Sequence, residues 1–170
     1  KLFGYLKSKG IKSHFIKQLD DVHQAVTKVS IVPLEVIVRN ITTGSLCKRL
    51  GVKEGMKLSR PLVEFCYKND ELGDPLILED HAILFGWATE EEIAKIKEIS
   101  LKVNSVLTEY FAARNIVLVD FKLEFGHHDG EIVVGDEISM DSMRLWDKET
   151  GASLDKDVYR FNKGDVMETY

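Results

Sequence analysis

The clearest hydrophobic pattern in the chain has the period of a helix, and it begins after a helix-start signal at Thr89. Thr89-Glu90-Glu91-Glu92 has the form of a capping box, in which Thr89 caps the helix and Glu92 reaches back three residues. The positions that follow at helical spacing are Ile93, Ile96, Ser100, Val103, Leu107 and Tyr110. The pattern predicts a long amphipathic helix that packs on the core, exposes its acidic start and ends near Asn115.

A second pattern, rich in β-branched residues, predicts strands at 31–39, 63–68, 116–125 and 131–137. In the first of them, the period of two places Glu35, Ile37 and Arg39 on one face and Leu34, Val36 and Val38 on the other. Strands and helices do not alternate regularly along the chain. This order favours an α+β fold with mixed or antiparallel sheets and flanking helices.

The first residues predict the end of a helix that is already under way at Lys1. Leu2, Phe3 and Leu6 can form its apolar stripe, and Gly10 can stop it. Because the chain does not begin with Met, we expect further residues upstream.

Composition narrows the class of protein. The net charge is −5, and the basic residues are scattered among acidic ones, which argues against a nucleic-acid-binding protein. No apolar run is long enough for a membrane span and no signal-peptide pattern is present, so we expect a soluble cytoplasmic protein with no membrane partner. Cys47 and Cys66 lack metal-ligand spacing, and the five histidines form no nucleophilic or metal-binding set.

The strongest local signal for chemistry is the segment from Val119 to Gly126, where charged and apolar residues alternate. Asp120, Lys122 and Glu124 share one face, and the other face is aromatic and aliphatic. One interpretation is the solvated outer face of an antiparallel sheet. The alternative is a ligand site, and the following strand bears on the choice.

That following strand is apolar until Asp136, and the turn before it sets the position of this carboxylate. A three-residue turn ending at Gly130 would pair Lys122 with Asp136 and place Asp136 on the face of Glu124. Two carboxylates beside a lysine suit Mg²⁺ and a polyphosphate, because Mg²⁺ takes one or two carboxylates and completes its shell with water and phosphate. A two-residue Asp129-Gly130 turn would put Asp136 on the opposite face, so this hypothesis requires an odd number of turn residues.

A second candidate site combines Arg39 with the turn Thr42-Thr43-Gly44-Ser45. We expect the turn to lead into a short helix with Ser45 as its N-cap and Gly51 as its stop. Free N–H groups at a helix start attract anions, Gly44 lets a ligand approach the backbone, and Arg39 can bind a phosphate in a bidentate manner. The alternative is a strand, a turn and a cap without a ligand. No Gly-Lys-Ser/Thr follows, so this is not a Walker A motif.

Other charged residues give weaker signals. Arg144 is either a second phosphate-binding cation or a surface arginine whose side chain lies over Trp146. Lys68 at a predicted strand end, and Lys156 and Arg160 in the tail, have the same status.

Several of these segments together resemble the phosphoribosylaminoimidazole-succinocarboxamide synthase (SAICAR synthetase) family. Residues 31–45 resemble its first motif and residues 118–126 its second, and 45–51, 68–71 and 144–150 are similar to further family segments in the same order. The resemblance covers essentially the whole chain. Two loop positions differ, because Gly73 stands where the family usually has His, and Met140 where it often has Pro.

The resemblance implies a two-domain α+β fold distantly related to ATP-grasp and kinase folds. Residues 1–30 would be the end of an N-terminal ATP-binding lobe, whose upstream lysine-containing strand and Gly-rich turn have no match here, and residues 31–170 the larger domain. The implied activity is an ATP-dependent ligase of de novo purine biosynthesis. It joins L-aspartate to a carboxylated aminoimidazole ribotide through an acyl phosphate, uses Mg²⁺, and forms a homo-oligomer, with a dimer expected.

The resemblance also implies roles for single residues. Glu124 and Asp136 would bind Mg²⁺ and nucleotide phosphates, Lys122 would meet the nucleotide and the reacting phosphoryl group, and Lys68 the nucleotide. Arg39, Gly44, Ser45 and Arg144 would hold the ribotide phosphate, and Asp120, Lys156 and Arg160 would surround the active site. Two other functions stay open on residue patterns alone: a phosphotransferase with another acceptor, and a non-catalytic nucleotide-binding module.

Overall fold

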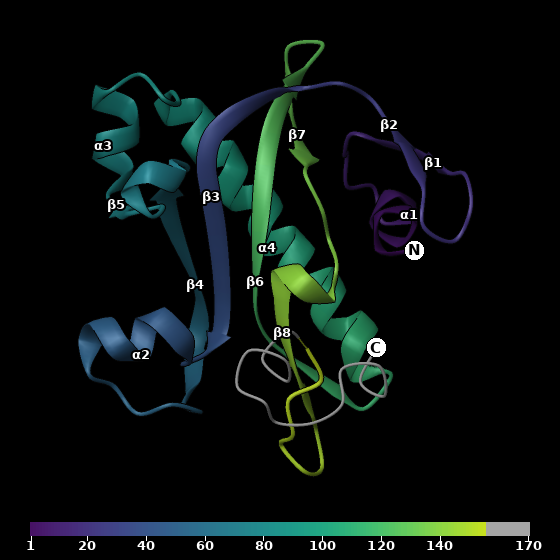
Figure 1. Ribbon diagram of the computed structural model, residues 1–170, viewed down its shortest axis with the longest axis vertical. Coiled ribbons are helices and arrows are strands. Elements are labelled where there is room, and N and C mark those ends of the chain that lie inside the picture. Colours follow the sequence, from purple (N-terminus) through teal and green to yellow (C-terminus); the bar gives the residue numbers. More distant parts are fainter. Residues whose placement is uncertain (156–170) are drawn as a thin grey trace.

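An antiparallel sheet forms the centre of the structure, a computed structural model that describes residues 1–155 (Figure 1). In this part of the chain the sheet has six strands in the order β5-β4-β3-β6-β7, and β8 also pairs with β6. The strands are β3 (Ser30–Ile41), β4 (Lys57–Tyr67), β5 (Leu76–Ile77), β6 (Ile116–His128), β7 (Glu131–Gly135) and β8 (Met143–Asp147). The helices are α1 (Leu2–Ser8), α2 (Gly44–Leu50), α3 (Glu79–Leu84) and α4 (Glu90–Ala112), with 3₁₀ turns at Asp70–Leu72 and Met140–Ser142. The predicted α+β class is confirmed.

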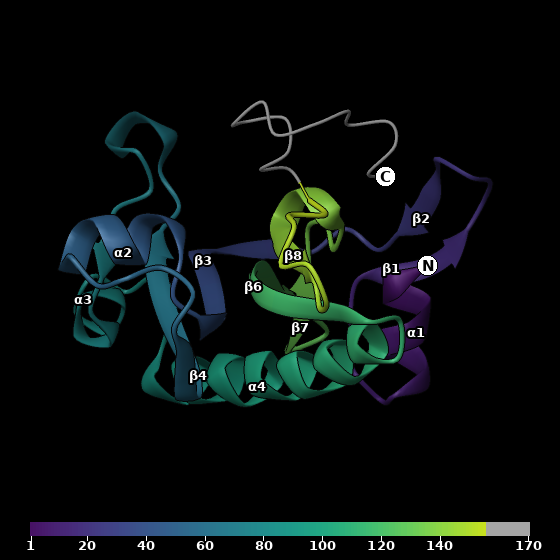
Figure 2. The same ribbon diagram turned by 90° about the horizontal axis from the view of Figure 1, so that it is seen from below.

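Helix α4 lies along one face of the sheet, as Figure 2 shows from below. Its start is the predicted capping box: the Glu92 N–H donates to the Thr89 hydroxyl at 3.1 Å, and the Thr89 N–H donates to the Glu92 carboxylate at 2.9 Å. The predicted apolar face is confirmed for Ile93, Ile96, Ser100, Val103 and Leu107, which are buried together with Asn104 and Phe111, whereas the predicted Tyr110 is only partly buried. No helix within residues 1–155 is long and apolar enough to cross a membrane.

The two faces of the sheet differ sharply in polarity. On β3 the predicted alternation is confirmed, with Leu34, Val36 and Val38 buried at no more than 1% exposure. They join one apolar core with the helix and with Phe121, Leu123 and Phe125 of β6. Full burial of such side chains contributes roughly 1.5–3 kcal/mol each, which fixes the register of both strands. The charged residues of β3 and β6 are therefore held on the face opposite α4.

The N-terminal segment packs on the end of this core. The predicted helix is confirmed as α1, in which Phe3 and Leu6 are buried, and Gly10 follows it at φ +75°. A separate two-stranded sheet of β1 (Phe15–Gln18) and β2 (Gln24–Val26) comes next. An isolated bridge from Ser13 to Val134 joins this segment to β7.

Four strands have no counterpart in the sequence-based prediction: β1, β2, the two-residue β5 and β8. β1 and β2 are short and mostly exposed, so they lack the apolar alternation that marks a strand. The sequence predicts turns and charged residues from Leu145 to Gly164, and this prediction is wrong for Leu145–Asp147, which belong to β8. Its buried Met143 and Leu145 do alternate with Arg144, although over only five residues.

Candidate functional site

Ten charged residues gather on the sheet face opposite α4, in two groups. The first, the arginine cluster, consists of Arg39, Arg49, Glu64, Asp120 and Arg144. The second, the lysine cluster, consists of Glu35, Lys68, Lys122, Glu124 and Asp136. Strands β3 and β6 contribute to both clusters, because the period of two returns a side chain to this face at every second residue.

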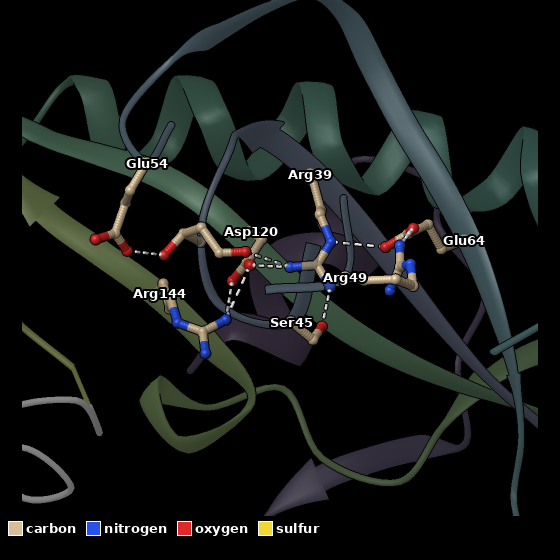
Figure 3. Close-up of polar contacts among 8 residues, drawn as sticks. Arg39, Ser45, Arg49, Glu54, Glu64, Asp120 and Arg144 are labelled. Atoms are coloured by element: carbon tan, nitrogen blue, oxygen red, sulfur yellow. Dashed lines mark hydrogen bonds and ion pairs between the residues drawn. The ribbon is translucent and has the colours of Figure 1, made fainter. Parts of the chain in front are cut away.

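Strand register builds the arginine cluster. Arg39 of β3 pairs directly with Asp120 of β6, and Asp120 pairs directly with Arg144 of β8. Asp120 therefore lies between two arginines, and its Oδ2 is 2.8 Å from Arg39 Nη1 and 3.0 Å from Arg144 Nη1 (Figure 3). Because directly opposed side chains on antiparallel strands are close, opposite charges placed there attract.

Arg39 is the most enclosed charge of the cluster, with 2% of its side chain exposed. Its Nε donates to Glu64 at 2.7 Å and its Nη1 to Asp120 at 2.8 Å. Its Nη2 donates to the Ser45 hydroxyl at 2.9 Å. Glu64 is also paired with Arg49 of α2, so positive and negative groups alternate from Arg49 to Arg144.

The turn before α2 brings Gly44 and Ser45 to this cluster, although not as a conventional cap. Thr43 occupies the N-cap position without a side-chain capping bond, and its hydroxyl donates instead to Glu54 at 2.6 Å. The prediction of Ser45 as N-cap is therefore wrong, because its hydroxyl is taken by Arg39. Gly51 ends the helix in the left-handed conformation, as predicted.

Gly44 is required at its position for two reasons. Its φ is +57°, a conformation that costs roughly 1–2 kcal/mol for a residue with a side chain. A Cβ there would also lie 2.9 Å from the Arg144 guanidinium. The backbone at Gly44 thus approaches Arg144 closely, which brings the two predicted phosphate-binding segments together.

The β6–β7 hairpin has a different turn from the one predicted. His128 pairs with Glu131, so the turn has two residues, Asp129 and Gly130, at φ +49° and +77°. Asp129 tolerates the left-handed region, which permits the tight turn with two positive φ values. The three-residue turn, and the pairing of Lys122 with Asp136 that followed from it, are wrong.

Asp136 nevertheless lies beside Lys122, because the strand ends before it. Gly135 is the last residue of β7 and pairs with Glu124. Asp136 takes a φ of +52°, which breaks the alternation and places its Oδ2 3.6 Å from Lys122 Nζ. The requirement for an odd number of turn residues was therefore also wrong.

The lysine cluster is centred on Glu124, whose side chain is 3% exposed. Its Oε1 accepts hydrogen bonds from both Lys68 and Lys122 at 2.8 Å. Lys122 also donates to Glu35 at 3.0 Å. Glu35 and Glu124 are directly opposed across β3 and β6, so the lysines offset a repulsion between like charges.

Both lysines are held in their charged form. The hydrogen bond to Glu124 raises the pKa of Lys68 above its ordinary value. Burial lowers the pKa of Lys122, but Glu124 and Glu35 outweigh burial and the net pKa is raised. Neither lysine is therefore suited to accept a proton near neutral pH, and both are suited to neutralise anionic charge. Nearby Cys66 is an unreactive thiol, because burial and the charge of Glu35 raise its pKa to about 11.

The two clusters carry opposite net charge. Three guanidinium groups and two carboxylates give the arginine cluster a charge of +1. Three carboxylates and two ammonium groups give the lysine cluster −1. The pair Arg39–Asp120 of one cluster and the pair Glu35–Glu124 of the other lie four residues apart along β3 and β6, which is about 13 Å at 3.3 Å per residue. One end of the site suits an anion and the other a cation.

The structure brings together nine of the candidates on or beside this face: Arg39, Gly44, Ser45, Lys68, Asp120, Lys122, Glu124, Asp136 and Arg144. Lys156 and Arg160 lie outside the described residues. Sequence reasoning missed Glu35, Arg49 and Glu64 as members of the site. Glu35 had been placed on the face of Arg39, and alternation through 63–68 puts Glu64, Cys66 and Lys68 together, so a signal existed for both carboxylates.

The fold and this site define an α+β protein with a charged face on an open sheet. Comparison with known proteins specifies it further, because a family model described as SAICAR synthetase matches residues 1–170. The chain belongs to the SAICAR synthetase family, and so to a family of ligases.

Relatives and solved structures agree with this assignment. Curated phosphoribosylaminoimidazole-succinocarboxamide synthases from Thermococcus sibiricus and Cellvibrio japonicus are 55% and 52% identical, over 99% of this chain and 72% of their own length. A SAICAR synthetase in complex with ADP has a TM-score of 0.96 and 52% identity, covering 99% of this chain and 72% of that one. The Ehrlichia chaffeensis synthase structure has a TM-score of 0.96 and 48% identity, with 99% and 73% covered.

Proposed function

We propose that the chain catalyses the ATP-dependent joining of L-aspartate to a carboxylated aminoimidazole ribotide, a step of de novo purine biosynthesis, on its charged sheet face. Family membership supports the reaction, and the ADP complex of a relative supports nucleotide use. The observation that carries the assignment of residues is the pair of clusters with opposite charge on one face. The ribotide spans them, with its phosphate at the arginine cluster and its carboxylate toward the lysine cluster.

The arginine cluster supplies the ribotide phosphate site. Arg39 and Ser45 are hydrogen-bonded there, and the backbone at Gly44 approaches the Arg144 guanidinium so closely that a Cβ would lie 2.9 Å from it. Arginine suits this role because its planar fork matches phosphate oxygens. Asp120 holds both guanidinium groups in one row, and we propose Lys156 and Arg160 as further residues that surround the site.

The lysine cluster supplies the nucleotide end. Lys68 and Lys122 stay charged, so they neutralise the phosphates of ATP and the phosphoryl group during its transfer. The ribotide carboxylate attacks the γ-phosphorus and forms an acyl phosphate with release of ADP. The aspartate amine then attacks the acyl carbon, an amide bond forms, and inorganic phosphate leaves. Catalysis rests on positioning and charge neutralisation.

The lysine cluster also fits Mg²⁺. Glu124 and Asp136 offer hard carboxylate oxygens on two sides of the Lys122 ammonium group, which is 2.8 Å from one and 3.6 Å from the other. Residues 1–155 contain no group of three or more His, Cys, Asp or Glu that could hold a metal alone. Mg²⁺ takes one or two protein carboxylates and completes its shell with water and substrate phosphates, so Glu124 and Asp136 would be the residues that hold it. When bound, Mg²⁺ offsets charge on those phosphates.

Domain organisation, assembly and location complete the proposal. Residues 1–30 form the end of an ATP-binding lobe and residues 31–170 the larger domain, which the separation of the β1–β2 sheet from the main sheet supports. We further propose a cytoplasmic homodimer that binds no nucleic acid and no membrane.

The deciding experiment measures ADP release by the full-length protein with the ribotide, with and without L-aspartate. Release that needs both substrates, and that falls in Asp136→Asn, is expected. Release that is indifferent to aspartate would replace the ligase by a phosphotransferase, and ADP binding without turnover would indicate a non-catalytic module.

A further inference from the structure

Glu64 has no place in the proposed chemistry, yet it is one of the most enclosed carboxylates of the site. It lies on β4 opposite Ile37 of β3, and 9% of its side chain is exposed. One oxygen accepts from Arg39 Nε at 2.7 Å and the other is paired with Arg49 of α2 (Figure 3). Both oxygens are therefore committed to arginines.

The bond to Arg39 determines how its guanidinium group is turned. Glu64 takes the Nε edge, and Asp120 takes Nη1 from β6 on the other side. Two carboxylates from different strands thus fix the plane of the group, and Nη2 is directed to Ser45. Without Glu64, rotation about the last side-chain bonds of Arg39 would no longer be opposed from the β4 side.

Arg49 in turn fixes Glu64. It is the more exposed partner, with 34% of its side chain accessible, and it reaches Glu64 from the last turn of α2. The same short helix begins at Gly44 and Ser45, beside the proposed phosphate site. The Arg49–Glu64 pair therefore ties the far end of α2 to Arg39, while Ser45 ties its near end.

Through its charge alone, Glu64 would weaken phosphate binding, whereas by orienting Arg39 it would strengthen phosphate binding. Its carboxylate lowers the positive charge of the arginine cluster from +2 to the observed +1, which weakens attraction for a phosphate. If charge were its main effect, removal of Glu64 would improve ribotide binding. If orientation of Arg39 were its main effect, removal would impair binding. The two effects differ in sign, which makes them separable.

We propose that Glu64, itself held by Arg49, is a positioning residue that orients Arg39 toward Ser45 for the ribotide phosphate. This inference rests on the proposed function and adds a residue that does not touch substrate. It acts on ribotide binding and not on the nucleotide end, because the hydrogen bonds and ion pairs of Glu64 within residues 1–155 go to Arg39 and Arg49 of the arginine cluster.

The test compares steady-state KM values for ribotide and for ATP in the full-length protein. In Glu64→Gln, the ribotide KM is expected to rise about tenfold, because the charged hydrogen bond that orients Arg39 is lost. The ATP KM is expected to change less than about twofold. Glu64→Asp keeps the charge and should recover part of the loss. Glu131→Gln, which removes an exposed ion pair with Lys12 of similar length, is the matched control and should change neither constant.

Three outcomes of Glu64→Gln overturn the inference. A lower ribotide KM would mean that Glu64 acts mainly through its charge, and an unchanged ribotide KM with a lower melting temperature would mean that it only stabilises the fold. An equal rise of the ribotide KM and the ATP KM would mean that its effect is not specific to ribotide binding. If the Glu64 variants fail to fold, Arg49→Lys decides. It keeps the charge but loses the planar fork, so a raised ribotide KM supports positioning and an unchanged one refutes it. Failure of the wild-type protein to require ribotide and aspartate would instead refute the proposed function.

Discussion

The arginine and lysine clusters stand on the same two strands, yet they are built for different tasks. Arg39 and Asp120 of the arginine cluster are buried, and the cluster takes its geometry from directly opposed residues on β3, β6 and β8. The lysine cluster is more open, since Asp136 is 40% exposed and Lys68 38% exposed, and its two acidic residues on β3 and β6 oppose each other. We therefore expect the arginine cluster to be the more rigid of the two and the lysine cluster to be the more adaptable.

This difference agrees with the energetics of buried ion pairs. A buried network gains little net stability over an apolar replacement, so its geometry is the stronger reason for its presence. Proteins orient phosphate with such fixed arginine forks. The open cluster instead offers Glu124 and Asp136 as oxygens that a cation can share with a nucleotide.

The largest effect is expected from Arg39→Met. This change leaves Glu64 paired with Arg49 and Asp120 paired with Arg144, both more exposed than Arg39, and removal of one partner of a buried pair costs about 3–5 kcal/mol. The free energy of unfolding, measured by denaturant titration, should fall by that amount, and ribotide binding should be lost. A loss below about 1 kcal/mol would show that the arginine cluster is as adaptable as the lysine cluster.

Lys122→Met tests the other side of the comparison. We expect kcat to fall about 10²–10³-fold, because a charge that stabilises the transferring phosphoryl group is removed. Stability should fall less than in Arg39→Met, since Lys68 still neutralises Glu124. Rapid-quench measurement of ADP formation separates chemistry from product release, and an unchanged chemical step would remove Lys122 from catalysis.

Gly44→Ala tests how tightly the arginine cluster is fitted. Left-handed strain and the 2.9 Å approach to Arg144 together should cost about 1–2 kcal/mol of stability and raise the ribotide KM. Gly51→Ala is the matched control, because its φ is +65° and no heavy atom lies within 4 Å of its Cβ. Both variants should lose stability by thermal unfolding, and only the first should lose ribotide affinity.

The comparison also shows what the sequence could and could not predict. Alternation placed Arg39 and Glu35 on one face of β3 and Asp120, Lys122 and Glu124 on one face of β6, because burial of the opposite face dictates register. It failed at Asp136, where a local left-handed φ overrides alternation and the turn length no longer matters. Alternation indicates the face of Glu64 on its own strand, but it does not indicate the contacts of Glu64 with Arg39 and Arg49, which form only after β4 and α2 have folded back beside β3. Contacts of this kind depend on which strands become neighbours, and a single sequence does not encode that in its periodicity.

The smallest effect is expected from Lys68→Met, and its pH dependence sharpens the contrast. Glu124 keeps Lys122 as a partner, and Lys68 is more than a third exposed, so the loss of unfolding free energy at pH 7 should be below about 1 kcal/mol.

The pKa of Lys68 in the folded protein is raised above its ordinary value of 10.5 by Glu124. Its stabilising effect is therefore complete below pH 10.5 and declines as the pH rises through the raised value. The difference in unfolding free energy between wild type and Lys68→Met should be constant from pH 7 to 10 and should shrink above pH 10. The corresponding difference for Arg39→Met should stay constant over the whole range, because arginine keeps its proton. A difference that grows with pH would mean that Lys68 is not paired with Glu124 in solution.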